Sequence, residues 1–275
     1  MIRTNTPELV STLRNCSYTD FVGLIAQTNV PPGAFSTINR WVLYSHMTSA
    51  SYLYEAACTT GFSLREAARL AGCAGEGADI SEASVLAARR SVEGTGLGEH
   101  VSYHHANAVE HQPARKPTHI IVGAALRFFP DPERMVARCA ELFGDDGYLL
   151  AAPFYTVRDI PQALLDEAKG VLGIVPTTAR YKEVTWLYRG FQLLFEDREL
   201  IEMETRDELV HYCESTASRA IHLLDTTDRE VYQAIYDRLF EIKDLCNRLR
   251  AYQGYSTMVL RYRASEFPNR YVELF

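Results

Sequence analysis

The feature that most constrains this chain is an alternation of short apolar segments with helical patterns between residues 51 and 154. Strands that alternate with helices pair into a mostly parallel sheet with helices on both faces, because right-handed crossovers return each strand beside the previous one. Together with two later strand-like segments, the pattern predicts a doubly wound α/β fold with a mostly parallel, seven-stranded sheet. The first five expected strands lie near 52–58, 75–80, 101–105, 119–122 and 147–154.

Helical regions flank this predicted sheet in the sequence. The helix start Thr6-Pro7-Glu8 and the break at Pro31-Pro32-Gly33 predict an N-terminal helical segment. Two long amphipathic patterns before the last strand predict a helical cap over the sheet. We therefore expect an N-terminal helical segment (1–48), a core (49–156), a helical cap with one core strand near 191–196 (157–254), and a final strand with a tail (255–275).

The composition narrows the class of partner. The net charge is −7 and no run of Lys and Arg occurs, which argues against a nucleic-acid partner. The six cysteines are scattered and form no Cys-x-x-Cys pair, which favours reduced thiols in a cytoplasmic protein. No apolar run approaches about 18 residues and no signal segment is seen, so we expect neither a membrane span nor secretion.

The turn after the first predicted strand carries the strongest binding signal. Glu55 stands just before this turn, and Gly61 ends it at the start of a helix. A helix N-terminus presents free backbone N–H groups and the positive end of its dipole to a ligand. Asp79 ends the next strand, where a carboxylate can accept hydrogen bonds from both hydroxyls of a ribose. The parallel strand order brings these residues to one edge of the sheet.

The segment 55–61, Glu-Ala-Ala-Cys-Thr-Thr-Gly, resembles the first motif of class I S-adenosylmethionine-dependent methyltransferases in a degenerate form. Ala57 and Thr59 stand where that family has glycines. Segments 77–81, 106–108, 119–132 and 144–150 resemble the later motifs in the same order. The resemblance implies a Rossmann-like fold, S-adenosylmethionine as the cofactor, and a methyl-transfer reaction. The cofactor-binding positions that it implies are Glu55, Ala57, Thr59, Gly61, Asp79, Ile80, Asn107, Ala108, Ala124 and Phe128.

The departures from the family pattern carry expectations of their own. Ala57 adds a methyl group to a tight turn, which is tolerable if its φ stays negative. The hydroxyl of Thr59 is expected to bond the carboxylate of the methionine moiety. Asn107 replaces an acid beside the adenine, and its amide can still donate to and accept from the base edge.

Methyl transfer depends chiefly on in-line positioning and exclusion of water, because the donor is already activated. A general base is needed only for an acceptor that keeps its proton at neutral pH. The candidates for that base are Tyr155, His46 and His211. Cap residues expected to contact a small-molecule acceptor are Tyr181, Tyr188, Arg189 and Tyr212. No metal site is expected, since the adjacent residues His104 and His105 point to opposite faces of a strand.

Three questions stay open at the level of sequence. The acceptor, and the atom that is methylated, are not defined, although the resemblance suggests secondary metabolism. The long cap helices could pack on the core or on a second subunit, so a homodimer is one expectation. Two rival functions are a non-catalytic scaffold that has lost cofactor affinity and an NAD(P)-dependent oxidoreductase. The oxidoreductase predicts Gly-x-Gly-x-x-Gly at the first turn, which this chain lacks.

Overall fold

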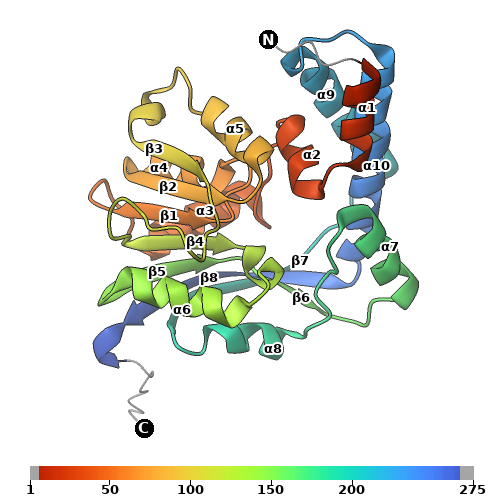
Figure 1. Cartoon of the computed structure of the whole chain (residues 1–275). Helices are drawn as coiled ribbons and strands as arrows, with labels where there is room; N and C mark the ends of the chain where they lie inside the picture. Colours follow the sequence, from red (N-terminus) through yellow and green to blue (C-terminus); the bar gives the residue numbers. More distant parts are fainter. Residues whose placement is uncertain (1–5, 267–275) are drawn as a thin grey trace.

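The structure is a computed structural model in which residues 6–266 are described. One mixed sheet forms its centre, in the strand order β3-β2-β1-β4-β5-β8-β6, with β7 paired to β8 (Figure 1). The strands are β1 (Tyr52–Ala56), β2 (Ala74–Asp79), β3 (Val101–His105), β4 (His119–Gly123), β5 (Asp146–Ala151), β6 (Phe154–Thr156), β7 (Gln192–Leu200) and β8 (Gln253–Arg263). The first five strands are parallel to one another, and β8 is antiparallel to its three neighbours.

Eight strands fill the seven predicted positions, because β5 and β6 share one position. Both pair with β8 in a single register, in which Ala151 faces Met258 and Phe154 faces Tyr255. Pro153 lies between them and has no N–H to donate, so the strand is interrupted without losing its register. The predicted doubly wound, mostly parallel α/β fold is therefore confirmed.

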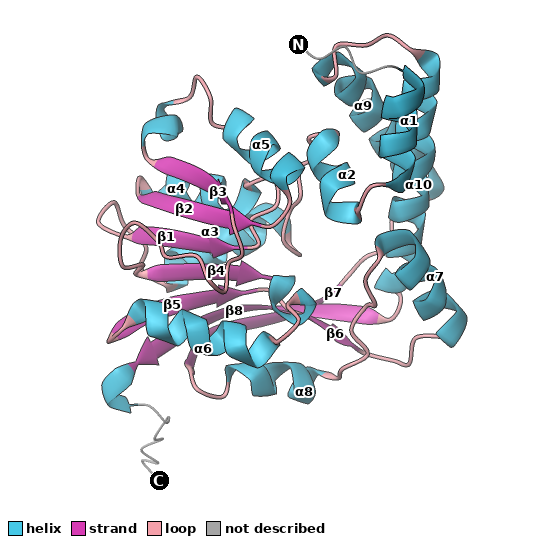
Figure 2. Ribbon diagram, in the orientation of Figure 1, coloured by secondary structure: helices cyan, strands magenta, loops and turns pink. Residues whose placement is uncertain are grey.

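Helices cover both faces of the sheet (Figure 2). Helices α3, α4 and α5 bury one face around Trp41, Leu53 and Leu64. Helix α6 and the turn η3 bury the other face around Tyr54, Ile120 and Met135. The helices of these two layers are α3 (Ala34–Tyr44), α4 (Phe62–Ala71), α5 (Glu82–Arg90) and α6 (Pro132–Phe143), with the short turns η1 (Gly96–Glu99), η2 (Ala125–Phe128), η3 (Trp186–Tyr188) and η4 (Ala264–Glu266) and the one-turn helix α8 (Tyr181–Thr185).

A third hydrophobic cluster forms the helical cap and includes Phe21, Ile235 and Leu239. In Figure 1 the helices α1, α9 and α10 stand together beyond one end of the strands, with α2 between them and the sheet. The N-terminal segment is thus divided, since its first two helices pack in the cap whereas α3 packs on the sheet. The cap helices are α1 (Thr6–Asn15), α2 (Tyr18–Leu24), α7 (Gln162–Leu172), α9 (Arg206–Leu223) and α10 (Arg229–Arg250).

Two helices of the fold begin at well-defined caps. Gly61 is the N-cap residue of α4, and the Leu64 N–H of its first turn donates to Glu55 at 3.0 Å. Helix α10 is capped by Asp228. The last part of the predicted tail, 267–275, lies outside the described residues. Within residues 6–266, no helix has both the length and the apolar character needed to cross a bilayer.

Candidate functional site

A cavity of about 2040 Å³ lies where the carboxyl ends of the parallel strands meet the helical cap. It has two sides of different composition. Nine of the ten predicted cofactor positions line one side, which we call the strand-end wall: Glu55, Ala57, Thr59, Asp79, Ile80, Asn107, Ala108, Ala124 and Phe128. The other side, the cap wall, consists of residues 14–19, residues 170–179, and Ala234, Asp237, Arg238, Glu241, Cys246, Leu249 and Arg250.

The turn after β1 keeps the backbone shape of a glycine-rich loop without most of its glycines. Ala57, Thr59 and Gly61 have φ values of 58°, 44° and 77°. The condition under which a methyl group at position 57 is easily tolerated, a negative φ, is therefore not met. The left-handed conformation costs an L-residue about 1–2 kcal/mol. The turn therefore holds two strained residues, and strain of this kind persists only where the surroundings fix it.

Hydroxyl groups in the turn supply that support. Thr59 Oγ1 accepts a hydrogen bond from Asn29 Nδ2 at 3.0 Å. Thr60 Oγ1 donates to the carbonyl oxygen of Gln27 at 2.9 Å and accepts from the Asn29 N–H at 3.1 Å. The threonine side chains therefore tie the turn to the segment that follows α2. Because a hydroxyl that accepts one hydrogen bond can still donate another, the predicted bond from Thr59 to a cofactor carboxylate stays a prediction.

Asp79 organises the end of β2. Its carboxylate is only 4% exposed and accepts from the Thr59 N–H and the Ser81 N–H, both at 2.9 Å. Burial raises the pKa of Asp79, although these backbone N–H groups oppose the shift, and the nearby carboxylate of Asp20 adds to it. A carboxylate offers about four acceptor positions. Asp79 can therefore hold the turn and still accept two further hydrogen bonds from the cavity side.

Glu55 is a second buried carboxyl group on the strand-end wall. It is 6% exposed, and burial raises its pKa to about 8 despite hydrogen bonds from Leu64 and Ser63. The group is therefore mostly protonated at neutral pH in the cofactor-free protein. A positive charge brought close to it would favour ionisation, because an opposite charge stabilises the carboxylate.

The remainder of the strand-end wall is small or apolar. Ile80 and Phe128 are 73% and 47% exposed, which is high for such side chains beside a cavity. Asn107 Oδ1 accepts from the Val109 N–H at 3.1 Å, so its amide oxygen shapes the loop after β3. Exposed apolar side chains beside a cavity favour a flat, partly apolar ligand.

Gly61 is the predicted cofactor position that does not line the cavity. A Cβ atom there would lie 2.5 Å from Cζ of Tyr103, whose hydroxyl donates to the Gly61 carbonyl at 2.8 Å. The glycine is thus required by packing against β3 and by its φ of 77°. Its position supports a structural role.

The cap wall is held by long-range polar contacts. Arg238 of α10 donates to the carbonyl oxygens of Leu13 and Cys16 and lies 4.5 Å from the ring centroid of Phe21. It therefore fixes the end of α1 against α10 and against α2. These residues come from opposite ends of the chain.

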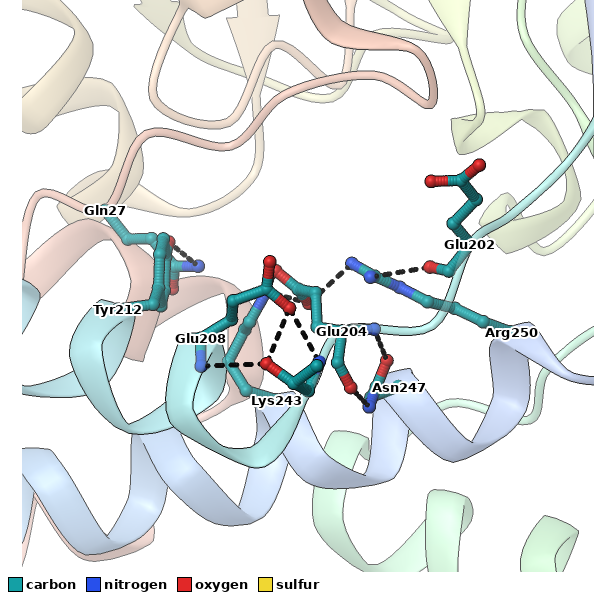
Figure 3. A network of polar contacts seen from close by, with 9 residues as sticks. Gln27, Glu202, Glu204, Glu208, Tyr212, Lys243, Asn247 and Arg250 are labelled. Carbon is teal, nitrogen blue, oxygen red and sulfur yellow. Dashed lines mark hydrogen bonds and ion pairs between the residues drawn. The ribbon is translucent and has the colours of Figure 1, made fainter.

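A second network, drawn in Figure 3, holds the turn between β7 and α9 against α10. Glu204 Oε2 lies 3.0 Å from Lys243 Nζ and 2.8 Å from Arg250 Nη2. Asn247 bonds the backbone of Glu204 twice, donating from Nδ2 to its carbonyl oxygen and accepting at Oδ1 from its N–H, each at 2.8 Å. Since Arg250 also lines the cavity, this network positions a cationic group on the cap wall.

The three predicted base candidates lie away from the cavity lining. His46 follows α3 near the start of β4, where the neighbouring Ser45 carbonyl contacts His119, so it lies at the opposite edge of the sheet. His211 is exposed on α9. Tyr155 follows Pro153 and Phe154, which do line the cavity, but its own ring packs edge-on against Tyr181. None of these three side chains lines the cavity.

The predicted acceptor contacts also lie elsewhere. The Tyr181 hydroxyl donates to Glu196 at 2.7 Å, and Tyr188 is buried in the core at 3% exposure. Arg189 reaches Glu133 on α6 at 3.4 Å. Tyr212 accepts from Gln27 Nε2 at 2.9 Å (Figure 3). Each of these four side chains has a structural contact and does not line the cavity.

Sequence reasoning missed the residues that form the cap wall. The apolar stripe of α10 was identified, but its polar residues Asp237, Arg238, Glu241 and Arg250 were not assigned to the site. Residues 237 and 241 are one turn apart, so they share a helix face. That spacing was a usable signal. No sequence pattern marked the turn at 14–19 or the loop at 170–179 as part of the site, because only tertiary packing brings these segments close to the sheet.

Comparisons with known proteins agree with this geometry. A model of the methyltransferase-domain family matches residues 54–147. The structure of the MccD protein is 24% identical, with a TM-score of 0.69, over 86% of this chain and 100% of that one. A search of curated proteins gave no match.

Two further solved structures share the fold. An S-adenosylmethionine-dependent methyltransferase from Geobacter sulfurreducens, in complex with S-adenosylhomocysteine, is 16% identical, with a TM-score of 0.65, over 88% of this chain and 96% of that one. Phosphoethanolamine N-methyltransferase 2 from Haemonchus contortus is 13% identical, with a TM-score of 0.64, over 93% of this chain and 60% of that one.

Proposed function

We propose that this chain is a class I S-adenosylmethionine-dependent methyltransferase, because a model of the methyltransferase-domain family matches residues 54–147, and that it methylates a small polar molecule bound between the two walls of its cavity. The observation that carries the proposal is the position of Asp79. Its buried carboxylate closes β2, is bonded to the turn after β1, and lines a cavity large enough for two ligands.

The residues of the strand-end wall fit the cofactor. Asp79 keeps acceptor capacity for a ribose, and Ile80 and Phe128 offer apolar contact for a base. The buried Glu55 is suited to a positively charged group, because that charge would favour its ionised form. S-adenosylmethionine, when bound, supplies a methyl group on a positively charged sulfur.

The chain itself contributes binding, orientation and exclusion of water. The tie between Asn29 and Thr59 keeps the segment after α2 over the turn, so this segment shields the donor side. The cap wall faces the strand-end wall and carries both signs of charge, with Arg238 and Arg250 beside Asp237 and Glu241. Such a surface suits a small polar acceptor. The cavity of about 2040 Å³ exceeds the roughly 300–1,000 Å³ of a single ligand site.

Finer features of the proposal rest on analogy. The Haemonchus contortus relative acts on phosphoethanolamine, which is a small polar acceptor. We also propose a role in secondary metabolism, a cytoplasmic location and a homodimer.

The test is calorimetric titration of S-adenosylhomocysteine into the wild-type protein and the Asp79→Ala variant. Loss of two hydrogen bonds to a charged group, each contributing about 1.5–3 kcal/mol, should weaken binding by about 100-fold or more. The matched control is Asp145→Ala, which removes the same charge from an exposed turn outside the cavity. Equal affinity in the wild type and Asp79→Ala would refute the assignment. Asp79→Asn keeps one acceptor oxygen and should give an intermediate loss in a folded protein.

The non-catalytic rival is favoured by the strained residues Ala57 and Thr59. A thermal-shift assay with S-adenosylmethionine, S-adenosylhomocysteine and NAD separates the rivals, because only a ligand that binds the folded state raises its melting temperature. We expect the two adenosyl ligands to stabilise the protein and NAD to leave it unchanged. If none of the three ligands raises the melting temperature, the result would support a non-catalytic scaffold.

A further inference from the structure

A cluster of three potential metal ligands lies outside the cavity, on β2, β3 and the loop that follows β3. Glu76, His104 and His111 place a carboxylate oxygen and two imidazole nitrogens within 4.8 Å of one another. None of the three lines the cavity between the walls. No metal site is predicted from the sequence, because the adjacent residues His104 and His105 point to opposite faces of a strand. The fold brings together residues that are up to 35 positions apart.

The carboxylate of this cluster is buried and held in place. Glu76 is 2% exposed, and its Oε2 accepts from the Tyr52 hydroxyl at 2.6 Å and the Ala114 N–H at 2.9 Å. The other oxygen, Oε1, is directed at the two imidazoles. It lies 2.7 Å from Nε2 of His111 and 3.8 Å from Nε2 of His104. Outer contacts of this kind orient metal ligands in known sites.

The two imidazole rings lie beside each other, with centroids 5.0 Å apart, and the His104 side of the cluster is the more exposed one. The His111 ring stacks on Tyr54 at 5.8 Å and has a side-chain exposure of 15%, whereas that of His104 is 41%. Ser102 Oγ lies 3.2 Å from Nε2 of His104, which shows that this nitrogen faces the solvent-accessible side of the cluster. A metal ion can therefore enter from the solvent and keep a water ligand.

A hydrogen bond between Glu76 and His111 would by itself explain part of this geometry, as a clamp on the loop. It does not explain why a second imidazole nitrogen, that of His104, also converges on Oε1. Two imidazoles and one carboxylate, with a water molecule as the fourth ligand, form a ligand set that Zn²⁺ uses.

We propose that Glu76, His104 and His111 bind a divalent transition-metal ion of the Zn²⁺ type, which fastens the loop after β3 to the sheet. Bonds of about 2.0–2.1 Å at a tetrahedral centre place ligand atoms about 3.3 Å apart. Oε1 and His111 Nε2 must therefore separate slightly, and His104 must approach. The metal takes the place of the proton on His111 Nε2, which moves to Nδ1 of that ring.

The site is connected to the cavity through the loop it holds. Asn107 and Ala108 line the strand-end wall, and the Asn107 carbonyl accepts from the His111 N–H at 2.8 Å. A metal on His111 would restrict this loop. Restriction of a loop before the ligand arrives lowers the ordering cost of binding. Zn²⁺ should therefore tighten S-adenosylhomocysteine binding by a few-fold.

The experiment titrates Zn²⁺ into the full chain after removal of metal with a chelator, without cofactor. We expect one equivalent to bind with a measurable heat, and Co²⁺ to give the strong visible absorption of a four-coordinate site. His104→Ala should weaken Zn²⁺ binding at least 10-fold, and Tyr52→Phe about 10-fold through the outer contact. Hydrogen exchange of residues 106–114 should slow when Zn²⁺ is added.

The matched control is His100→Ala, which removes an exposed imidazole just before β3 and should leave the affinity unchanged. Since His104 is half-exposed, its variant should fold, and circular dichroism checks this. The proposal is overturned if Zn²⁺ produces neither heat nor a Co²⁺ spectrum, or if His104→Ala and His111→Ala bind Zn²⁺ as tightly as the wild type. Because no cofactor is present, this failure would leave the methyltransferase assignment untouched.

Discussion

The two walls of the cavity are built on different principles. The strand-end wall is held by backbone geometry and by buried carboxyl groups such as Asp79, which accepts hydrogen bonds from the turns that follow β1 and β2. The cap wall is held by side chains that reach across the chain, as when Arg238 contacts the end of α1. The comparison teaches that one wall is held mainly by contacts between neighbouring turns of the sheet, whereas the other is an assembly of helices joined by side chains distant in sequence.

The largest expected effect is a loss of stability caused by a substitution in the turn of the strand-end wall. Gly61→Ala places a Cβ 2.5 Å from the Tyr103 ring at a φ of 77°. We expect a loss of about 3 kcal/mol of unfolding free energy from overpacking and backbone strain. Urea denaturation measures it. The control is Gly94→Ala, where φ is 68° but no atom lies within 4 Å, so only the strain of about 1 kcal/mol applies. Equal losses at the two positions would contradict tight packing of the turn.

The second prediction concerns pH and the same wall. Burial raises the folded-state pKa of Glu55 to about 8, above its unfolded value of 4.5. The folded state then binds more protons, so this contribution to stability is complete below pH 4.5 and is lost as the pH rises through 8. Glu55→Gln should remove this decline in stability. The difference in unfolding free energy between pH 5 and pH 9 should therefore be smaller in the variant by about 2 kcal/mol or more. Parallel stability curves for the wild type and the variant would exclude this role.

The third prediction perturbs only the cap wall. Glu204→Ala removes the partner of Lys243 and Arg250, which are partly buried, and should cost about 1–2 kcal/mol. Hydrogen exchange should rise near the end of α10, while affinity for S-adenosylhomocysteine stays unchanged. Glu202→Ala is the control, because Arg250 bonds the backbone oxygen of Glu202 rather than its side chain. A matching loss of cofactor affinity in Glu204→Ala would show that the walls are not independent.

The smallest effect is a gain in stability. Ala57→Gly relieves a left-handed conformation with φ of 58° and should stabilise the fold by about 1 kcal/mol. Ala56→Gly, one residue earlier in the buried strand β1, should instead destabilise it by a similar amount. Thermal melts of the two variants give opposite shifts if the turn is strained. Shifts of the same sign would mean that Ala57 is not under strain.

Much of the strand-end wall was predictable, because it depends on short stretches of sequence. The order of strands and helices fixes which loops share an edge, and so Glu55, Asp79 and Asn107 were assigned to one site before the fold was known. The conformation of Ala57 was not predictable in this way. A non-glycine residue with positive φ is rare, and only the surrounding contacts with Asn29 and Asp79 hold the turn in that shape.

By itself, the sequence determined the layered fold, the similarity of residues 54–147 to the methyltransferase-domain family and the polar edge of the sheet, since each follows from local periodicity and from motifs a few residues long. The tertiary structure alone decided what faces that edge. Arg238 contacts the end of α1, and Glu76 lies close to His104 and His111. These contacts join segments that are far apart in the sequence, and no local sequence pattern relates such segments. The predicted roles of His46, His211 and Tyr188 lack support for the same reason, since residue type cannot tell which way a helix or loop will turn a side chain.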